Sequence, residues 1–209
     1  VLAIGCGSAT SAPAAGPAIG GAEAVHLLRG EGREQALGGA ALVGRGLRRR
    51  EGREVRLWAR DVTGLAGGQS ARLPGVNLPK TVSVTAEISD LIGADAVLLT
   101  LPMQALRGFL AEHPVLDGVA LVACCKGVDL TTLKGPTALI EAACPNSAFA
   151  ILTGPSFAAD IARGLPTALT LASTTDAQDW QRSLSTPALR IYRSADVTGA
   201  ELGGALKNV

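Results

Sequence analysis

Short apolar runs of strand length recur along the chain and alternate with helical or loop segments. In order, these runs are Val1–Ile4, Glu54–Trp58, Ala96–Leu101, Gly118–Cys125, Phe149–Thr153, Ala168–Ala172 and Leu189–Tyr192. Helical composition is found at Gln104–Glu112 and Thr137–Cys144, and Ala86–Ile92 fits a short helix. Such alternation is typical of βαβ units. The pattern therefore predicts an α/β fold with a mostly parallel sheet and flanking helices.

Amino-acid composition and net charge indicate the kind of core and the kinds of binding partner to expect. The 209 residues are 47% apolar but only 3% aromatic, so the core must be built mainly from aliphatic side chains. A formal net charge of +1 gives no general attraction to nucleic acid or to an anionic membrane. Residues 45–60 are rich in arginine, which leaves a nucleic-acid binder open. Trp58 is the one aromatic residue in this stretch, which leads directly into a predicted strand, and this favours a solvated helix face.

The cysteines and the hydropathy pattern suggest a cytoplasmic location. Cys6, Cys124, Cys125 and Cys144 lack the spacing of a zinc or haem site, so we expect no metal, and the adjacent pair is interpreted as small core residues. No export signal opens the chain, and no segment reaches the roughly 18 apolar residues of a membrane span. We therefore expect reduced thiols and no membrane insertion.

A glycine-rich turn follows the first apolar run. Gly5, Gly7 and Ser8 resemble the start of a dinucleotide fingerprint, in which glycines let the backbone approach a pyrophosphate. Thr10 stands where the third glycine belongs, so an ordinary glycine-rich turn remains the alternative. Residues 11–50 exceed the usual length of this connection, and we interpret them as an irregular insertion or a reading-frame disturbance.

Polar residues follow several of the predicted strands, where a parallel sheet places its ligand crevice. Arg60 precedes Asp61 at the position of the usual ribose-binding acid, and an arginine there can accept a 2′-phosphate or simply be exposed. Lys126 follows the fourth strand, and its amine can reach an anion or point to solvent. After the fifth strand, Gly154–Ser156 leads into an expected helix, Phe157–Arg163, with Pro155 at its start to leave amides free for an anion.

The last segment predicts a helix with a lysine near its end. Gly199, Gly203 and Lys207 are four residues apart and share one helix face, so the glycines would leave room for a close neighbour. Near other cations the pKa of the Lys207 amine would fall toward neutrality, as general acid–base work requires. A solvent-exposed lysine is the alternative.

Three stretches together resemble bacterial-type NAD(P)-dependent glycerol-3-phosphate dehydrogenases. They are Glu54–Asp61 with Leu73–Pro79; Gly93–Pro102 with Gln104–Arg107 and Lys126-Gly127; and Leu152–Ala158 with Gly164–Ala168 and Glu201–Val209. The likeness runs from about residue 52 to the last residue, with Val1–Ser8 as a detached fragment.

This resemblance implies a Rossmann-like fold and a hydride transfer between NAD or NADP and dihydroxyacetone phosphate, giving sn-glycerol 3-phosphate for phospholipid synthesis. Lys207 matches the catalytic lysine. The substrate-binding positions match Lys126, Gly154 and Ser156, and the cofactor-binding positions match Gly5, Gly7, Ser8, Arg60, Lys126 and Ala158.

The resemblance also implies that a domain is missing. We expect a dinucleotide-binding domain over 1–196 and, over 197–209, the first helix of a helical substrate domain whose acid and Ser-Arg-Asn cluster are absent. Ala9 stands where the family has a bulky aromatic residue. We therefore expect little or no activity from this chain. The NADH-to-NADPH preference and a full-length homodimer remain open, as do a related hydroxy-acid dehydrogenase and a nonenzymatic nucleotide-binding module.

Overall fold

An eight-stranded sheet forms the centre of the computed structural model, which describes residues 2–6, 55–60, 62, 77–78 and 82–206. The strand order is β3-β2-β1-β4-β5-β6-β7-β8. The strands are β1 (Leu2–Cys6), β2 (Val55–Ala59), β3 (Val82–Thr85), β4 (Ala96–Leu99), β5 (Leu121–Ala123), β6 (Phe149–Thr153), β7 (Thr167–Ala172) and β8 (Leu189–Ser194). Neighbouring strands pair in parallel except β6 and β7, which are antiparallel. The predicted α/β class and mostly parallel sheet are confirmed.

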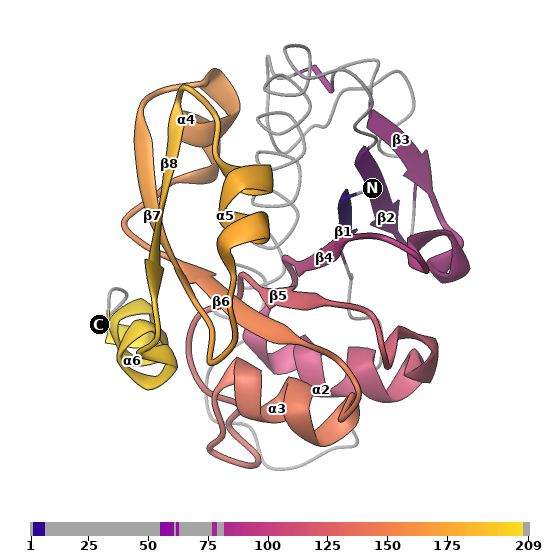
Figure 1. Cartoon of the computed structure of the whole chain (residues 1–209). Coiled ribbons are helices and arrows are strands. Elements are labelled where there is room, and N and C mark those ends of the chain that lie inside the picture. The colour runs from indigo at the N-terminus through magenta and orange to yellow at the C-terminus, as the bar shows by residue number, and fades with distance from the viewer. Residues whose placement is uncertain (1, 7–54, 61, 63–76, 79–81, 207–209) are drawn as a thin grey trace, which may run out of the picture.

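Helices cover both faces of the sheet (Figure 1). The α-helices of the described residues are α2 (Met103–Glu112), α3 (Pro136–Ala143), α4 (Ala158–Arg163), α5 (Gln178–Leu184) and α6 (Val197–Leu206), with 3-10 turns η2 (Ile88–Leu91) and η3 (Pro114–Leu116). Helices α2 and α3 lie side by side below β5 and β6 (Figure 1). Helix α6 packs on β6 and β7, and α5 packs on β8.

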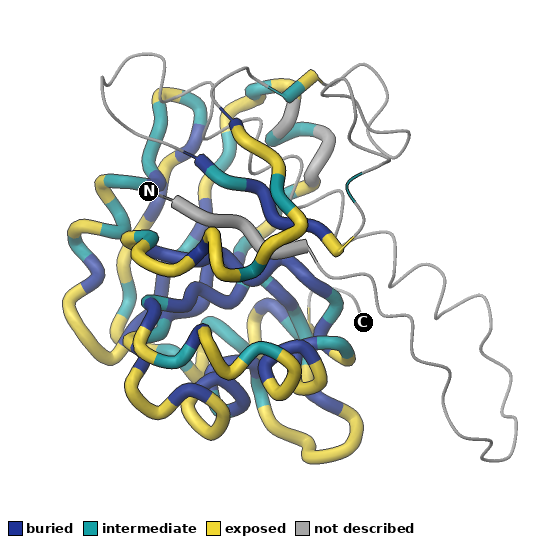
Figure 2. The backbone as a smooth tube through the Cα atoms, turned by 90° about the vertical axis from the view of Figure 1, so that its right-hand side faces the viewer, coloured by how far each residue is buried: buried dark blue, intermediate teal, exposed yellow. Residues whose placement is uncertain are grey.

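The hydrophobic core divides into two clusters on opposite faces of the sheet. In β6, Leu152 belongs to one cluster and Ile151 to the other, because successive side chains of a strand alternate between faces. Strand β4 is buried at every position, as expected for a central parallel strand covered on both sides. Figure 2 shows this buried centre with exposed residues at the loops around it.

Several predicted boundaries differ from the structure. Strand β1 continues through Gly5 and Cys6, which the sequence placed after the strand. Strand β3 and helix α5 were not predicted, and the expected helix at Ala86–Ile92 is the short 3-10 turn η2. Strand β3 lies at the edge of the sheet and pairs only with β2 among the described strands, so it needs no continuous apolar run.

Candidate active site

The carboxyl ends of β5 and β6 bring together the predicted substrate-binding residues. The two strands pair in parallel with Ala123 opposite Ile151, so the segments that follow them leave the same edge of the sheet. Lys126 Nζ donates a hydrogen bond to the carbonyl oxygen of Gly154 at 3.3 Å. The backbone amide of Ser156 donates to the same oxygen at 3.0 Å. Lys126, Gly154 and Ser156 therefore lie within one small region.

Only glycine fits at position 154. Its φ is +155°, and a Cβ atom there would lie 2.9 Å from Leu169 Cδ2 and 3.1 Å from the carbonyl oxygen of Ala168. The backbone of residue 154 thus passes directly against β7, which turns its carbonyl toward the amine of Lys126. Because residue 154 has no side chain, its backbone can lie close to β7, and its carbonyl oxygen can accept the hydrogen bond from Lys126.

Helix α6 approaches the same edge through Gly204, not through the glycines that the sequence indicated. A Cβ atom on Gly204 would lie 2.6 Å from Thr153 Oγ1 and 3.7 Å from Lys126 Cγ. Gly199 and Gly203 are exposed, and no atom of the described residues lies within 4 Å of a Cβ placed on Gly203. The predicted close-packed face was therefore wrong by one residue. The packed face contains Val197, Ala200 and Gly204, which follow the three- to four-residue helical repeat.

Glu201 fixes α6 to the rest of the molecule. Its Oε1 accepts hydrogen bonds from the backbone amide of Thr137 at 2.8 Å and from the Thr137 hydroxyl at 2.7 Å. Thr137 belongs to the first turn of α3, whose N-cap Gly135 has no side chain that could accept a hydrogen bond. A Cβ atom on Gly135 would overlap the Glu201 carboxylate, so the glycine also leaves the space that the carboxylate occupies.

The sequence did not single out Glu201 or Thr153. The contact between Glu201 and Thr137 joins residues 64 positions apart, which no local pattern reveals. Thr153 ends a predicted strand and precedes a predicted glycine, so its position could have been found, but its burial under α6 could not.

Helix α4 begins later than expected. It starts at Ala158 with Phe157 as its N-cap, so Pro155 lies outside the helix and does not occupy the first helical position. The amide of Ser156 already donates to the Gly154 carbonyl. The prediction that Pro155 begins the helix and leaves the amides after it free for an anion is therefore wrong. The end of the helix at Gly164, with φ +77°, matches the predicted stop.

Arg60 directly follows β2, as the sequence implied, but its guanidinium is in an ion pair. Arg60 Nη2 lies 2.8 Å from Glu112 Oε2, at the last residue of α2. His113 stands next to this pair, and its pKa is lowered by burial first, with a further lowering from the charge of Arg60. A role for Arg60 toward a 2′-phosphate stays a prediction.

Several predicted site residues lie partly or wholly outside the described residues. The structure does not describe Gly7, Ser8, Lys207 or residues 11–50. Gly5 is described in β1, between Trp58 of β2 and Leu99 of β4. Ala158 is the first residue of α4, and only its backbone is described.

The adjacent cysteines lie beside Lys126 without forming a reactive pair. Cys125 is buried, and desolvation raises the pKa of its thiol to about 12. Burial raises the pKa of the Cys124 thiol as well. Both thiols are free, which matches their interpretation as small core residues. Among the described residues, no three His, Cys, Asp or Glu side chains are grouped in a way that could hold a metal ion.

In the part of the chain that the structure describes, no helix has both the length and the apolar character that a bilayer crossing requires.

The family model and the curated relatives that match this chain all point to the same protein family. Residues 44–179 match the model of the NAD-dependent glycerol-3-phosphate dehydrogenase N-terminus. A glycerol-3-phosphate dehydrogenase [NAD(P)+] of Paracoccus denitrificans is 60% identical over 158 residues, covering 74% of this chain and 50% of the relative. The protein of the same name from Cereibacter sphaeroides is 58% identical over 176 residues, covering 82% of this chain and 55% of the relative. The chain thus spans about half the length of the curated relatives that it matches.

Solved structures support the same fold. The crystal structure of glycerol-3-phosphate dehydrogenase from Coxiella burnetii superposes with a TM-score of 0.75 at 23% identity, covering 99% of this chain and 57% of that one. At this identity the likeness establishes the fold, here Rossmann-like, and the matched family model establishes the kinship. The chain therefore belongs to the family of NAD-dependent glycerol-3-phosphate dehydrogenases, of which it carries the N-terminal part.

Proposed function

We propose that this chain is the dinucleotide-binding half of an NAD(P)-dependent glycerol-3-phosphate dehydrogenase. The observation that carries the proposal is the position of the Lys126 amine, 3.3 Å from the Gly154 carbonyl at the carboxyl edge of the parallel sheet. That edge is where open α/β sheets bind their ligands. The ammonium supplies a positive charge for a phosphorylated triose such as dihydroxyacetone phosphate or sn-glycerol 3-phosphate.

The described residues fit a nicotinamide dinucleotide. The strand order changes direction at β1, which lies between β2 and β4, and this is the switch point where such folds bind a dinucleotide. Gly5 lies near the carboxyl end of β1, with strands on both sides. NAD or NADP would supply the hydride when bound. Arg60 and Ala158 complete the proposed cofactor contacts, together with Gly7 and Ser8 outside the described residues.

Lys207 is the proposed proton donor to the substrate carbonyl oxygen. It follows Ala200 by seven residues and Gly204 by three, and this spacing belongs to the face on which those two residues pack. Gly204 contacts Thr153 and Lys126, so we expect the Lys207 amine near the Lys126 amine, although residue 207 lies outside the described residues.

The proposed domain division places 1–196 in the dinucleotide-binding domain and 197–209 at the start of a helical substrate domain. The exposed apolar side chains of α6 support it, since Leu202 is 53% and Leu206 is 66% exposed. A cytoplasmic location and a homodimer of the full-length protein belong to the same proposal.

A chimeric enzyme tests the proposed function. The matched 158 residues of the Paracoccus denitrificans relative are replaced by those of this chain, and oxidation of NADPH and NADH is followed with dihydroxyacetone phosphate. We expect turnover by the chimera and little or none by the 209-residue chain. The Lys207→Ala chimera should lose orders of magnitude in rate. A folded chimera that binds NADPH without turnover would support a nonenzymatic nucleotide-binding module instead.

A further inference from the structure

The hydroxyl of Thr153 is buried at the edge where the site residues meet. Thr153 is 6% exposed and is the last residue of β6. Its Oγ1 has no hydrogen-bond partner among the described residues. A buried hydroxyl without a partner costs free energy, because it has given up its hydrogen bonds to water. Its retention at this position therefore needs a reason other than packing.

The stem of Lys126 and this hydroxyl approach the same point of α6. A single point, the Cβ position of Gly204, is 2.6 Å from Thr153 Oγ1 and 3.7 Å from Lys126 Cγ. The hydroxyl and the lysine stem thus lie together under the end of α6. The present bond from Lys126 Nζ to the Gly154 carbonyl is 3.3 Å long. It exceeds the usual N–H···O distance of about 2.9–3.0 Å.

The two groups are chemically complementary. A lysine ammonium carries three donors on a flexible four-carbon stem and accepts no hydrogen bond, whereas a threonine hydroxyl can accept. Rotation about the bonds of the Lys126 stem changes the direction of the ammonium. The Gly154 carbonyl belongs to the residue next to Thr153, so one ammonium can be shared between the two oxygens.

We propose that Thr153 is a positioning residue for Lys126. Its hydroxyl accepts a hydrogen bond from the Lys126 ammonium, which alternates between this oxygen and the Gly154 carbonyl. The pair of acceptors restricts the directions in which the ammonium points, and so orients the charge toward an incoming phosphate or carbonyl oxygen. The orienting role rests on the proposed function, whereas the contact between the two side chains does not.

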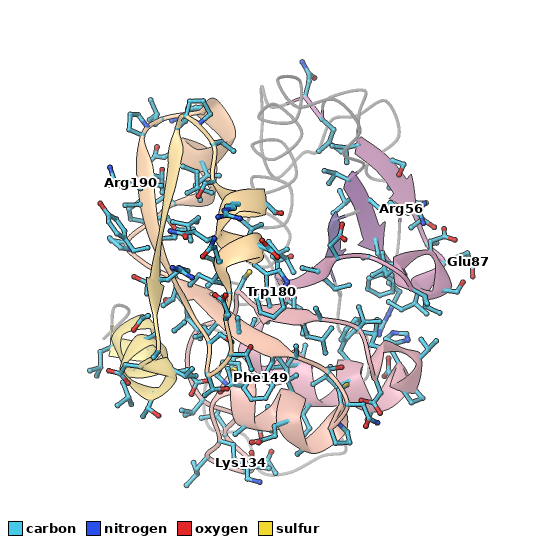
Figure 3. All side chains as sticks on the ribbon, in the orientation of Figure 1. Arg56, Glu87, Lys134, Phe149, Trp180 and Arg190 are labelled. Atoms are coloured by element: carbon cyan, nitrogen blue, oxygen red, sulfur yellow. The ribbon has the colours of Figure 1, made fainter. Side chains whose placement is uncertain are left out.

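Competitive acetylation of lysines tests the contact in the 209-residue chain itself. Acetic anhydride is applied in limiting amount, and labelling of Lys126 is expressed relative to Lys134, an exposed lysine labelled at the bottom of Figure 3. Thr153→Val removes the hydroxyl at constant shape, so the ammonium loses an acceptor and its neutral, reactive form increases. We expect the Lys126-to-Lys134 ratio to rise roughly three- to tenfold. Thr153→Ser should keep the wild-type ratio.

Thr174→Val is the matched control, because it removes an exposed threonine hydroxyl far from Thr153. Thr174 follows the carboxyl end of β7, which lies beside the amino end of β6, whereas Thr153 is at the carboxyl end of β6. This control should leave the ratio unchanged. The unfolding midpoint of Thr153→Val should stay close to that of the wild type, because loss of the hydrogen bond to Lys126 is offset by removal of the cost of burying the hydroxyl. An unchanged ratio in Thr153→Val overturns the proposal. A raised ratio with a lower midpoint also overturns it, because general loosening then exposes Lys126.

A second arm separates this inference from the proposed function. Dihydroxyacetone phosphate is added before acetylation to the chimeric enzyme, and we expect it to protect Lys126 in the chimera and less so in the chimera that carries Thr153→Val. If it does not protect Lys126 in the chimera, the proposed substrate role of this lysine fails. The ligand-free ratio still decides whether Thr153 holds the amine.

Discussion

The Glu201 carboxylate accepts hydrogen bonds from both the amide and the hydroxyl of Thr137, and so caps helix α3 from helix α6. A helix start normally satisfies its free amides with a nearby side chain. Here the cap comes from a residue 64 positions later. One contact therefore completes α3 and sets the position of α6 over β6.

Removal of this cap should destabilise the fold. We expect Glu201→Ala to lower the free energy of unfolding by about 1–2 kcal/mol, because the Thr137 amide and hydroxyl lose their acceptor. Glu201→Gln keeps an acceptor oxygen and should lose less. Urea denaturation measures both, and Glu141→Ala on the exposed side of α3 is the control. Equal stability of Glu201→Ala and Glu141→Ala would contradict the capping role.

Two adjacent glycines of α6 should respond in opposite directions to alanine. A Cβ at Gly204 would lie 2.6 Å from Thr153 Oγ1, so Gly204→Ala should cost about 1–3 kcal/mol through overpacking. Gly203 has open space around it, so Gly203→Ala should gain about 0.5–1 kcal/mol from helix propensity. Thermal unfolding of the two variants gives the comparison. A stabilising Gly204→Ala would mean that α6 does not approach β6 as described.

The loop after Lys126 should weaken in acid through Asp129. The Thr132 hydroxyl donates to the Asp129 carboxylate at 2.7 Å, and this bond chiefly lowers the pKa of Asp129 below its ordinary value of 3.8. Arg107 of α2 lies 3.4 Å away and lowers it further. A carboxyl with a lowered pKa stabilises the fold above pH 3.8, and this contribution is lost as the pH falls from there through the lowered pKa.

Unfolding free energies measured from pH 6 to below pH 3 test this contribution. Asp129→Asn should be less stable than the wild type at pH 6, and the difference should shrink in acid. A constant difference across that range would show that the ionised form of Asp129 does not matter.

The buried thiol of Cys125 should be unreactive in the folded chain. Its pKa is raised to about 12 by desolvation, so almost no thiolate is present near neutral pH. Iodoacetamide at pH 8 should label Cys125 only after denaturant is added, as read by mass spectrometry of its peptide. Rapid labelling of Cys125 in the native chain would disprove the burial of this residue.

The sequence predicted the central strands well because their signals are local. Phe149–Thr153 was predicted with the bounds that β6 has, since an apolar run stops at a Gly-Pro pair. Strand β3 was missed because Val82 and Val84 alternate with polar residues over only four positions. Helix α5 was missed because Trp180 and Leu184 are the large apolar residues in an otherwise polar segment.

The proximity of two candidate site residues could be predicted because both directly follow strands of the sheet. Gly154 and Lys126 follow strands, and parallel pairing brings such residues to one edge. The packed face of α6 was assigned to Gly203 in place of Gly204, since two adjacent glycines give no periodicity to choose between them. The partners of Glu201 and Arg60 depend on contacts between distant segments, which only the folded chain defines.

The antiparallel pairing of β6 with β7 has a consequence for the length of the connection between them. A connection between parallel strands must carry the chain from the carboxyl end of one strand back to the amino end of the next, so it must be long enough to span the length of the strands. Residues 154–166 leave and return at one edge, because β7 runs against β6. The length of the strands therefore does not set the length of this connection, and a longer or shorter connection need not shift any strand.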